Sequence, residues 1–206
     1  MRILAWRVAP YDNGTYLIVD GTRDAICIDP SQGERELMRA VSEGDLHLLA
    51  ILDTHGHPDH VWANAAMKEA TRARLAIHSL DAYRLDARTA PPSPMGRVPG
   101  SEADDLIEEG PVTYLRDVRV EAIHTPGHTE GSTCFYLPDA GVLFSGDVLF
   151  AGNVGRVDQP GGNAADMEKS LERVAGFPPD TKVYPGHGPT TTIAAELPWL
   201  RGFRFY

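Results

Sequence analysis

The segment THGHPDH, residues 54–60, constrains this chain more than any other feature, because it places three imidazoles and one carboxylate within six positions. It directly follows the apolar run 48–52, which reads as a buried strand. Gly56 and Pro58 favour a tight turn that cannot lie inside a helix. Such a cluster arises by chance in on the order of one per thousand sequences of this composition. The segment therefore predicts a metal site at the end of a strand.

Further metal ligands are expected elsewhere in the chain. Neutral imidazole and carboxylate bind Zn²⁺, Fe²⁺ or Mn²⁺, but one cation cannot take all four ligands from so tight a turn. Three candidates each follow an apolar strand and a glycine: His128 in TPGH, Asp147 in FSGD and His187 in YPGH. A glycine at each strand end lets the backbone turn sharply and bring the next side chain close to the others.

The pattern along the chain predicts an α/β fold in a single domain, residues 1–206. Strands are predicted at 3–8, 15–19, 25–28, 48–52, 75–78, 118–124, 133–137, 142–145 and 182–184. Helices are predicted at 33–43, 61–71 and 164–174, with a helical turn at 80–85. The proline-rich segment 89–103 excludes helix and central strand and is predicted to form a lid or wall of a substrate pocket.

Charge and hydropathy exclude several functions. The chain has 19 Lys and Arg against 29 Asp and Glu, a net charge of −10, which disfavours binding to nucleic acid or to an anionic membrane. No apolar run approaches the ~20 residues of a membrane span, and Arg2 and Arg7 interrupt any signal-peptide core, so a cytoplasmic location is expected. Cys27 and Cys134 lie in strand-like runs and are expected to be buried thiols.

The motifs HGHPDH, PGH, SGD and PGHG together resemble the metallo-β-lactamase superfamily. The stretches FSGDVLFAGNVGR and PPDTKVYPGHGP are similar to its glyoxalase II (hydroxyacylglutathione hydrolase) branch, over about residues 12 to 195. The resemblance implies an αββα sandwich, two mixed β-sheets flanked by helices with the metals at one edge. It implies a first metal site of His55, His57 and His128, a second site of Asp59, His60 and His187, and Asp147 as the bridge.

The resemblance also implies the reaction. Two divalent ions, zinc first with iron or manganese as alternatives, would lower the pKa of bound water to ~7 and make hydroxide available at neutral pH. Asp59 would orient this hydroxide, so that Asp59 and Asp147 are the expected catalytic residues. The chain is thus expected to be a metal-dependent hydrolase of a small-molecule thioester or related acyl compound. His57 separates it from the flavodiiron members, which the resemblance would give a Glu there.

Several departures leave alternatives open. Glyoxalase II proper carries a C-terminal helical domain, but 19 residues follow His187 here, so this chain is expected to lack that domain. Arg156 matches a basic residue that contacts a glutathione carboxylate in the family, or else it pairs with Asp158. The GRVD pattern also resembles persulfide dioxygenases, which bind a single iron. A lactone or phosphoester hydrolase and a non-enzymatic metal-binding module are the remaining alternatives.

Two further groups of residues carry expectations. The histidines outside the motifs, His47, His78 and His124, are expected to be structural. Five large side chains crowd the last eight residues: Trp199, Leu200, Phe203, Phe205 and Tyr206. Leaving so much apolar area in water is unfavourable, so this tail is expected to pack on its own domain or, as the favoured reading, on a second copy in a homo-oligomer.

Overall fold

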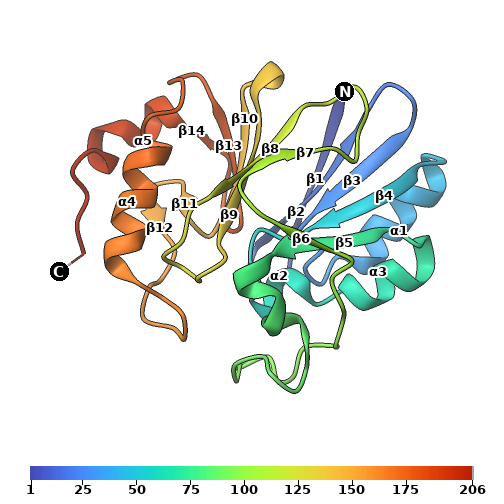
Figure 1. Ribbon diagram of the computed structural model, residues 1–206. Coiled ribbons are helices and arrows are strands. Elements are labelled where there is room, and N and C mark those ends of the chain that lie inside the picture. The colour runs from blue at the N-terminus through green and yellow to red at the C-terminus, as the bar shows by residue number, and fades with distance from the viewer. Residues whose placement is uncertain (206) are drawn as a thin grey trace.

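Two six-stranded sheets face each other in the computed structural model, which describes residues 1–205 (Figure 1). The first sheet contains, in spatial order, β1 (Arg2–Val8), β2 (Asn13–Val19), β3 (Asp24–Ile28), β4 (His47–Leu52), β5 (Arg74–His78) and β6 (Asp105–Ile107). Strands β1 to β3 pair antiparallel, whereas β3 to β6 pair parallel. The first sheet is therefore mixed, as predicted.

The second sheet is mixed as well. It contains, in spatial order, β14 (Thr191–Thr192), β13 (Lys182–Pro185), β10 (Val142–Gly146), β9 (Thr133–Leu137), β8 (Val120–His124) and β7 (Gly110–Val112). Only β10 and β13 pair parallel, and the other neighbours are antiparallel. A separate two-stranded hairpin is formed by β11 (Leu149–Phe150) and β12 (Asn153–Val154).

Helices cover the outer face of each sheet, which confirms the αββα sandwich (Figure 1). The helices are α1 (Glu34–Glu43), α2 (Pro58–Val61), α3 (Asn64–Thr71), α4 (Ala164–Val174) and α5 (Ile193–Leu200), with 3-10 turns at Ser79–Leu85 and Pro138–Ala140. Helices α1 and α3 pack on the first sheet, and α4 and α5 on the second. Within residues 1–205, none of the helices has the length and apolar character to cross a membrane.

The apolar interior has three layers, one between the sheets and one under each pair of helices. Tyr16, Ile28 and Leu52 of the first sheet meet Phe135 and Phe144 of the second in the central layer. These contacts hold the two sheets face to face, so that the loops at the ends of their strands meet at one edge. Cys27 and Cys134 are buried free thiols, as expected.

The structure corrects several element boundaries. The helix predicted at 61–71 begins only at Asn64, as α3, because the preceding short helix α2 ends at Val61 and the amide of Ala63 donates to the carbonyl of Ser31 (2.8 Å). Strands β6 and β7 were not predicted, since three residues are too few for a periodic pattern. Helix α5 was also missed because Pro198, which lies inside it, argues against a helix.

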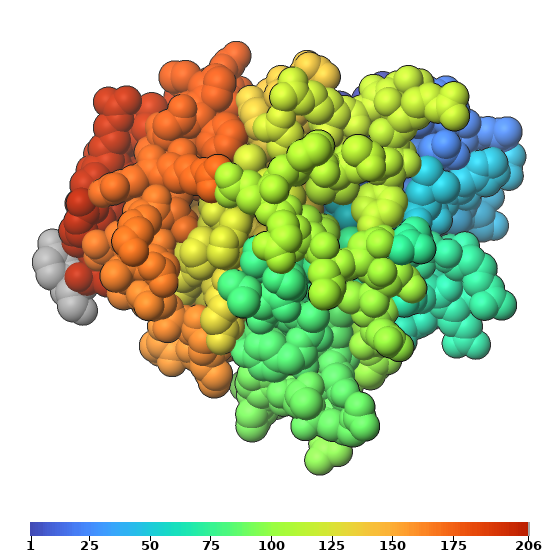
Figure 2. Space-filling model, viewed as in Figure 1, coloured from blue at the N-terminus to red at the C-terminus, as the bar shows by residue number. Residues whose placement is uncertain are grey.

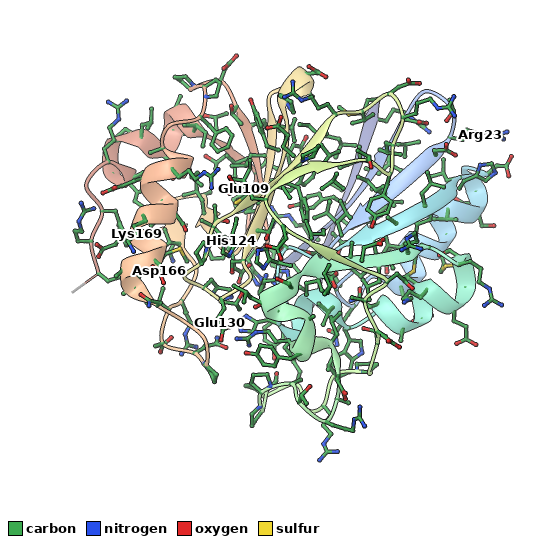
Figure 3. The ribbon with its side chains drawn as sticks, viewed as in Figure 1. Arg23, Glu109, His124, Glu130, Asp166 and Lys169 are labelled. Atoms are coloured by element: carbon green, nitrogen blue, oxygen red, sulfur yellow. The ribbon has the colours of Figure 1, made fainter. Side chains whose placement is uncertain are left out.

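A stacked pair of imidazoles that belongs to neither ligand triplet joins the two halves of the molecule, with His124 directly before the TPGH motif. The rings of His78, at the end of β5, and His124, at the end of β8, lie 4.1 Å apart with planes 13° from parallel. Figure 3 labels His124 and the neighbouring Glu109, whose carboxylate accepts the His124 amide hydrogen bond. Burial, together with the neighbouring His124, lowers the pKa of His78 below 6.5. Both rings fit the structural role expected for them.

This pair predicts a pH-dependent contribution to stability. Because the pKa of His78 is lower in the folded than in the unfolded chain, the unfolded chain takes up the proton first as the pH falls below 6.5. The free energy of unfolding is therefore expected to fall from about pH 7 to about pH 5, and less steeply in His78→Gln. Urea unfolding at a series of pH values measures this slope, with the exposed His47→Gln as control. An unchanged slope in His78→Gln would contradict the assignment.

The C-terminal tail packs on its own domain. Leu200 is buried, and Trp199, Phe203 and Phe205 pack against the cluster beneath α4 and α5. The amide of Phe205 donates to Glu168 of α4 (2.9 Å). Tyr206, the fifth residue of the expected group, lies outside the described residues. A homo-oligomer remains a prediction, and a monomer in light scattering at micromolar concentration would contradict it.

Candidate metal centre

Four loops that leave the strands at one edge of the sandwich carry the predicted ligands. His55 and His57 lie in the turn that follows β4 of the first sheet, whereas Asp59 and His60 lie in the short helix α2, which begins at Pro58 where the sequence predicted only a turn. The other three ligands follow strands of the second sheet: His128 after β8, Asp147 after β10 and His187 after β13. The side chains of all seven meet in one cluster, with Asp147 in the middle. The structure therefore brings together every residue of the predicted ligand set.

Two glycines make this approach possible. Gly146 has a φ of +48°, a left-handed conformation that side-chain-bearing residues rarely adopt, and it turns the chain directly before Asp147. At Gly186 a Cβ atom would collide with the carboxylate of Asp147 and the ring of His60. The glycine that precedes His187 is therefore needed for close packing of the ligands.

Two triplets of ligand atoms can be distinguished, and a further group of His55, His60 and Asp147 spans them. In the first, His57 Nδ1 lies 3.1 Å from His55 Nε2 and 2.8 Å from His128 Nε2. In the second, Nε2 of His60 and Nε2 of His187 are 3.3 Å apart, and Asp59 Oδ2 lies 3.3 Å from the His187 nitrogen. The two triplets match the two sites implied by the family resemblance.

The carboxylate of Asp147 lies between the triplets. Its Oδ1 is 3.3 Å from His60 Nε2, and its Oδ2 is 3.3 Å from His128 Nε2 and 3.4 Å from His187 Nε2. Each oxygen thus faces ring nitrogens, and Oδ2 faces one from each triplet. This is the placement expected of a residue that bridges two metal ions.

The donor atoms fit divalent metal ions. In a tetrahedral site with metal–nitrogen bonds of ~2.0–2.1 Å, neighbouring ligand nitrogens lie about 3.3 Å apart, close to the spacing seen here. Moreover, Oδ1 of Asp147 is buried without a hydrogen-bond partner. Buried polar atoms in native proteins are nearly always paired, so an orphaned carboxylate oxygen among imidazoles is a suitable metal ligand.

The remaining ring nitrogens of the histidines are held by the surrounding protein. His60 Nδ1 lies 3.0 Å from Asp29 Oδ2, and His128 Nδ1 lies 2.7 Å from the carbonyl of Arg156. His187 Nδ1 donates to the carbonyl of Tyr11 (2.8 Å). Because these acceptors engage Nδ1, they leave Nε2 of each ring free to face the cluster.

The electrostatics differ between the triplets. Burial and the neighbouring His128 lower the pKa of His57 to about 3, so this ring is neutral at physiological pH. Burial would also lower the pKa of His187, but its hydrogen bonds to Asp147 and Asp59 outweigh this and raise it to about 10. For Asp59 and Asp147, burial favours the neutral acid, yet the charge of His60 outweighs it and lowers both pKa values. Both carboxyl groups are therefore ionised.

Two supporting aspartates were missed by the sequence reasoning. Asp29 follows β3 in the run AICID, so the rule that identified the ligands, a polar residue at the end of a buried strand, could have found it. Its carboxylate accepts hydrogen bonds from the amide and the hydroxyl of Thr54 (2.7 and 2.6 Å). Asp81 lies inside a 3-10 turn and carries no such signal.

A cavity of about 470 Å³ opens onto the ligand cluster. His57, Asp59, His128, Asp147 and His187 lie on its wall, together with residues 90–95 of the proline-rich segment. This segment has no helix or strand and forms the lowest part of the molecule in Figures 1 and 2. The predicted wall of the pocket is thus present, and the cavity has the size of a small-molecule site.

Arg156, the predicted substrate-binding residue, lies at the exposed rim of this cavity. Its Nε and Nη2 each donate to a carboxylate oxygen of Asp158 at 2.8 Å. The pairing with Asp158 that the sequence left open is therefore formed, and contact of Arg156 with a substrate remains a prediction.

Replacing the proline-rich loop is expected to change substrate binding and to leave the metal content unchanged. Replacing residues 91–100 with a short Gly/Ser linker removes Pro91, Pro94 and Met95 from the cavity wall. We expect KM to rise about 3- to 10-fold, because these apolar side chains would bury part of the substrate. Metal content is expected to stay unchanged because no predicted ligand lies in the loop. Steady-state kinetics and elemental analysis measure the two effects, and unchanged kinetics would mean that the loop is a passive surface excursion.

Comparison with known proteins identifies relatives along the whole chain. Residues 10–187 match the family described as Metallo-beta-lactamase superfamily. The chain is 33% identical to a probable metallo-hydrolase, YqgX, of Bacillus subtilis, covering 97% of this chain and 99% of the relative. It is also 33% identical to the hydroxyacylglutathione hydrolase of Pelagibacter ubique, covering 85% of this chain and 66% of that protein.

Solved structures agree with these sequence matches. The B3 metallo-beta-lactamase BLEG-1 superposes with a TM-score of 0.89 at 30% identity, over 96% of this chain and 97% of that one. TTHA1623 in a di-iron-bound form has a TM-score of 0.83 at 34% identity, over 94% and 96%. ETHE1 from Myxococcus xanthus has a TM-score of 0.79 at 32% identity, over 98% and 85%. With its fold, its ligand motifs and these matches in agreement, the chain belongs to the metallo-beta-lactamase superfamily.

Proposed function

We propose that this chain is a hydrolase that uses two divalent metal ions to cleave a thioester or a related acyl bond of a small molecule. The observation that carries the proposal is the pair of ligand triplets on either side of Asp147, open to a cavity of small-molecule size. The similarity to hydroxyacylglutathione hydrolases supports the thioester class. Zinc is the proposed metal, with iron or manganese as alternatives, since imidazole and carboxylate suit all three.

The residues of the site have separate proposed roles. Two ions held by these ligands would supply a water molecule of lowered pKa and polarise the acyl carbonyl. Asp147, buried between the triplets, holds its carboxylate toward both. Asp59 is ionised and faces the cavity, and a hydrogen bond from Asn13 Nδ2 (3.1 Å) to its Oδ2 fixes its position. In this proposal Asp59 would accept a hydrogen bond from the reacting water and orient it.

The substrate would lie in the cavity above these groups. The apolar side chains of Pro91, Met95 and Phe150 line its wall and suit the hydrocarbon part of an acyl compound. Arg156 at the rim is the proposed contact for a substrate anion, in competition with Asp158. A cytoplasmic location is part of the same proposal.

A mononuclear iron dioxygenase that oxidises a glutathione persulfide is the second candidate. The GRVD pattern at residues 155–158 favours it, and the similarity to the ETHE1 structure supports it as well. Two imidazoles and one carboxylate, as in the group of His55, His60 and Asp147, would suit a single iron with open coordination positions.

Metal content and oxygen dependence together separate the candidates. Elemental analysis of the purified protein is combined with two assays, cleavage of S-lactoylglutathione without oxygen, and sulfite formation from glutathione persulfide with oxygen uptake. Two metal equivalents and anaerobic thioester cleavage support the hydrolase. One iron equivalent and oxygen-dependent sulfite formation would overturn it in favour of the second candidate. Turnover of lactones or phosphoesters alone would move the proposal to those substrates.

A further inference from the structure

Arg84 is a buried cation on the wall of the cavity, and one of its nitrogens has no hydrogen-bond partner. The residue is 1% exposed and lines the cavity. Its Nε donates to Asp81 Oδ1 (3.3 Å), and its Nη2 donates to Glu130 Oε2 (2.6 Å) and to the carbonyl of Pro160 (2.8 Å). Its Nη1 is buried and finds no acceptor. The centre of the Tyr83 ring lies 5.0 Å from the guanidinium carbon, a cation–π contact that supplies no hydrogen-bond acceptor oxygen.

An unpaired buried donor on a cavity wall indicates an acceptor that arrives with a ligand. Buried polar groups in native proteins are nearly always paired, and each exception calls for an explanation. Two buried side-chain atoms without a partner belong to residues on this wall: Asp147 Oδ1 and Arg84 Nη1. A metal ion accounts for the carboxylate oxygen. A substrate oxygen accounts for the guanidinium nitrogen in the same way.

The position of Arg84 relative to the ligand turn agrees with this role. Its aliphatic stem packs on Gly56, where an added Cβ would lie 2.5 Å from Arg84 Cβ. Gly56 stands between His55 and His57, so Arg84 lies on the same wall of the cavity as His57 and His128 of the first ligand triplet. A substrate whose acyl carbon faces the ligands could therefore reach Arg84 with another oxygen.

The surrounding charges favour an uncharged acceptor. Asp81 and Glu130 already place two carboxylates against the single guanidinium, and Glu130 is labelled in Figure 3. A third carboxylate, from a substrate, would be repelled by these two in a site of low dielectric. An amide carbonyl or a hydroxyl oxygen accepts a hydrogen bond without this repulsion.

We propose that Arg84 is a substrate-binding residue whose Nη1 donates to an uncharged oxygen of the acyl substrate. The oxygen is an amide carbonyl of the thiol half or a hydroxyl of the acyl half. This inference rests on the proposed function, because it assumes an acyl substrate in the cavity. It makes Arg84 a determinant of specificity, since substrates without the oxygen leave the buried donor unpaired.

Paired substrates test the proposal. Thioesters of N-acetylcysteamine and pentanethiol differ by the amide in the thiol half, and lactoyl and propionyl thioesters differ by the hydroxyl in the acyl half. Arg84→Met keeps an apolar stem and removes the donor. In one of the pairs we expect this variant to lower kcat/KM about 10- to 100-fold for the oxygen-bearing substrate, mainly through KM. Its partner substrate should change less than about 3-fold.

The control is Arg88→Met, which removes an exposed arginine that pairs with Asp86 in the same segment. It should leave both substrate ratios at their original values. If Arg84→Met changes both members of each pair by the same factor, the specificity role is overturned. Should Arg84→Met fail to fold, Arg84→Lys keeps a cation beside Asp81 and Glu130 without the forked donor, and the same comparison applies.

Binding separates this inference from the proposed function. If no thioester is cleaved, the proposed function fails. The affinities of uncleavable thioether analogues with and without the oxygen can still be measured. Calorimetry then compares the wild-type protein with Arg84→Met. A preference of the wild-type protein for the oxygen-bearing analogue, lost in the variant, supports the role of Arg84. Equal preferences in both proteins would overturn it.

Discussion

The substitution Asp147→Asn is expected to remove bound metal and to abolish turnover together. The neutral amide offers one oxygen and a pair of N–H donors, so it cannot bridge two cations as the carboxylate can. Changing a residue that merely supports a metal ligand lowers metal affinity or activity about 10- to 100-fold. Loss of the bridging ligand should therefore lower activity by at least about 100-fold. Elemental analysis and thioester turnover of the purified variant measure the two losses.

Asp139→Asn, which changes an exposed aspartate in the 3-10 turn before β10, is the matched control and should keep both metal and activity. The assignment of two metal ions would be contradicted if Asp147→Asn kept two metal equivalents and normal turnover. Loss of activity with full metal content would instead assign Asp147 a role in orienting the reacting groups only.

The substitution Asp81→Ala is expected to have the largest effect on stability. The buried carboxylate accepts hydrogen bonds from the amides of Gly56 (2.8 Å) and Gly131 (2.9 Å) and from the hydroxyl of Thr129 (2.8 Å), and it faces Arg84. Breaking a buried ion pair from one side costs about 3–5 kcal/mol. The midpoint of urea unfolding should fall accordingly.

Asp81 also ties the turn of His55 and His57 to the loop that follows His128. Metal affinity is therefore expected to fall about 10- to 100-fold in Asp81→Ala, as for other residues that orient ligands. The exposed Asp117→Ala should change stability by no more than about 0.5 kcal/mol. If Asp81→Ala unfolds at the same urea concentration as Asp117→Ala, the hydrogen bonds of Asp81 contribute nothing net.

Most strands and the candidate ligands could be predicted because both depend on local patterns, whereas the αββα sandwich and the division into two sites were implied by the family resemblance. Buried strands appear as apolar runs, and the residue types that follow them, as at His55 and Asp147, are rare enough to be recognised. The supporting contacts depend on pairs far apart in the chain, such as Asp81 with Gly131. The carbonyl of Tyr11, which orients His187, is a backbone group and leaves no trace in residue type.

The unpartnered nitrogen of Arg84 is likewise invisible in the sequence. Its meaning depends on which acceptors the fold places around it, Asp81 on one side and Glu130 on the other. The short edge strands β6 and β7 form because neighbours in the sheets offer them hydrogen-bond partners, while their own residues carry no periodic signal.

The central apolar layer between the sheets contains none of the seven ligands. Unlike a zinc finger, whose folding energy comes from its ion, this sandwich has a core that can form before any metal arrives. We therefore expect folding to be separable from metal loading, and the ion that is bound to depend on cellular supply as well as on the affinities of the loops. The metal content of a preparation then records the growth conditions of the cell, and reconstitution with defined ions is required before an activity can be assigned to the protein itself.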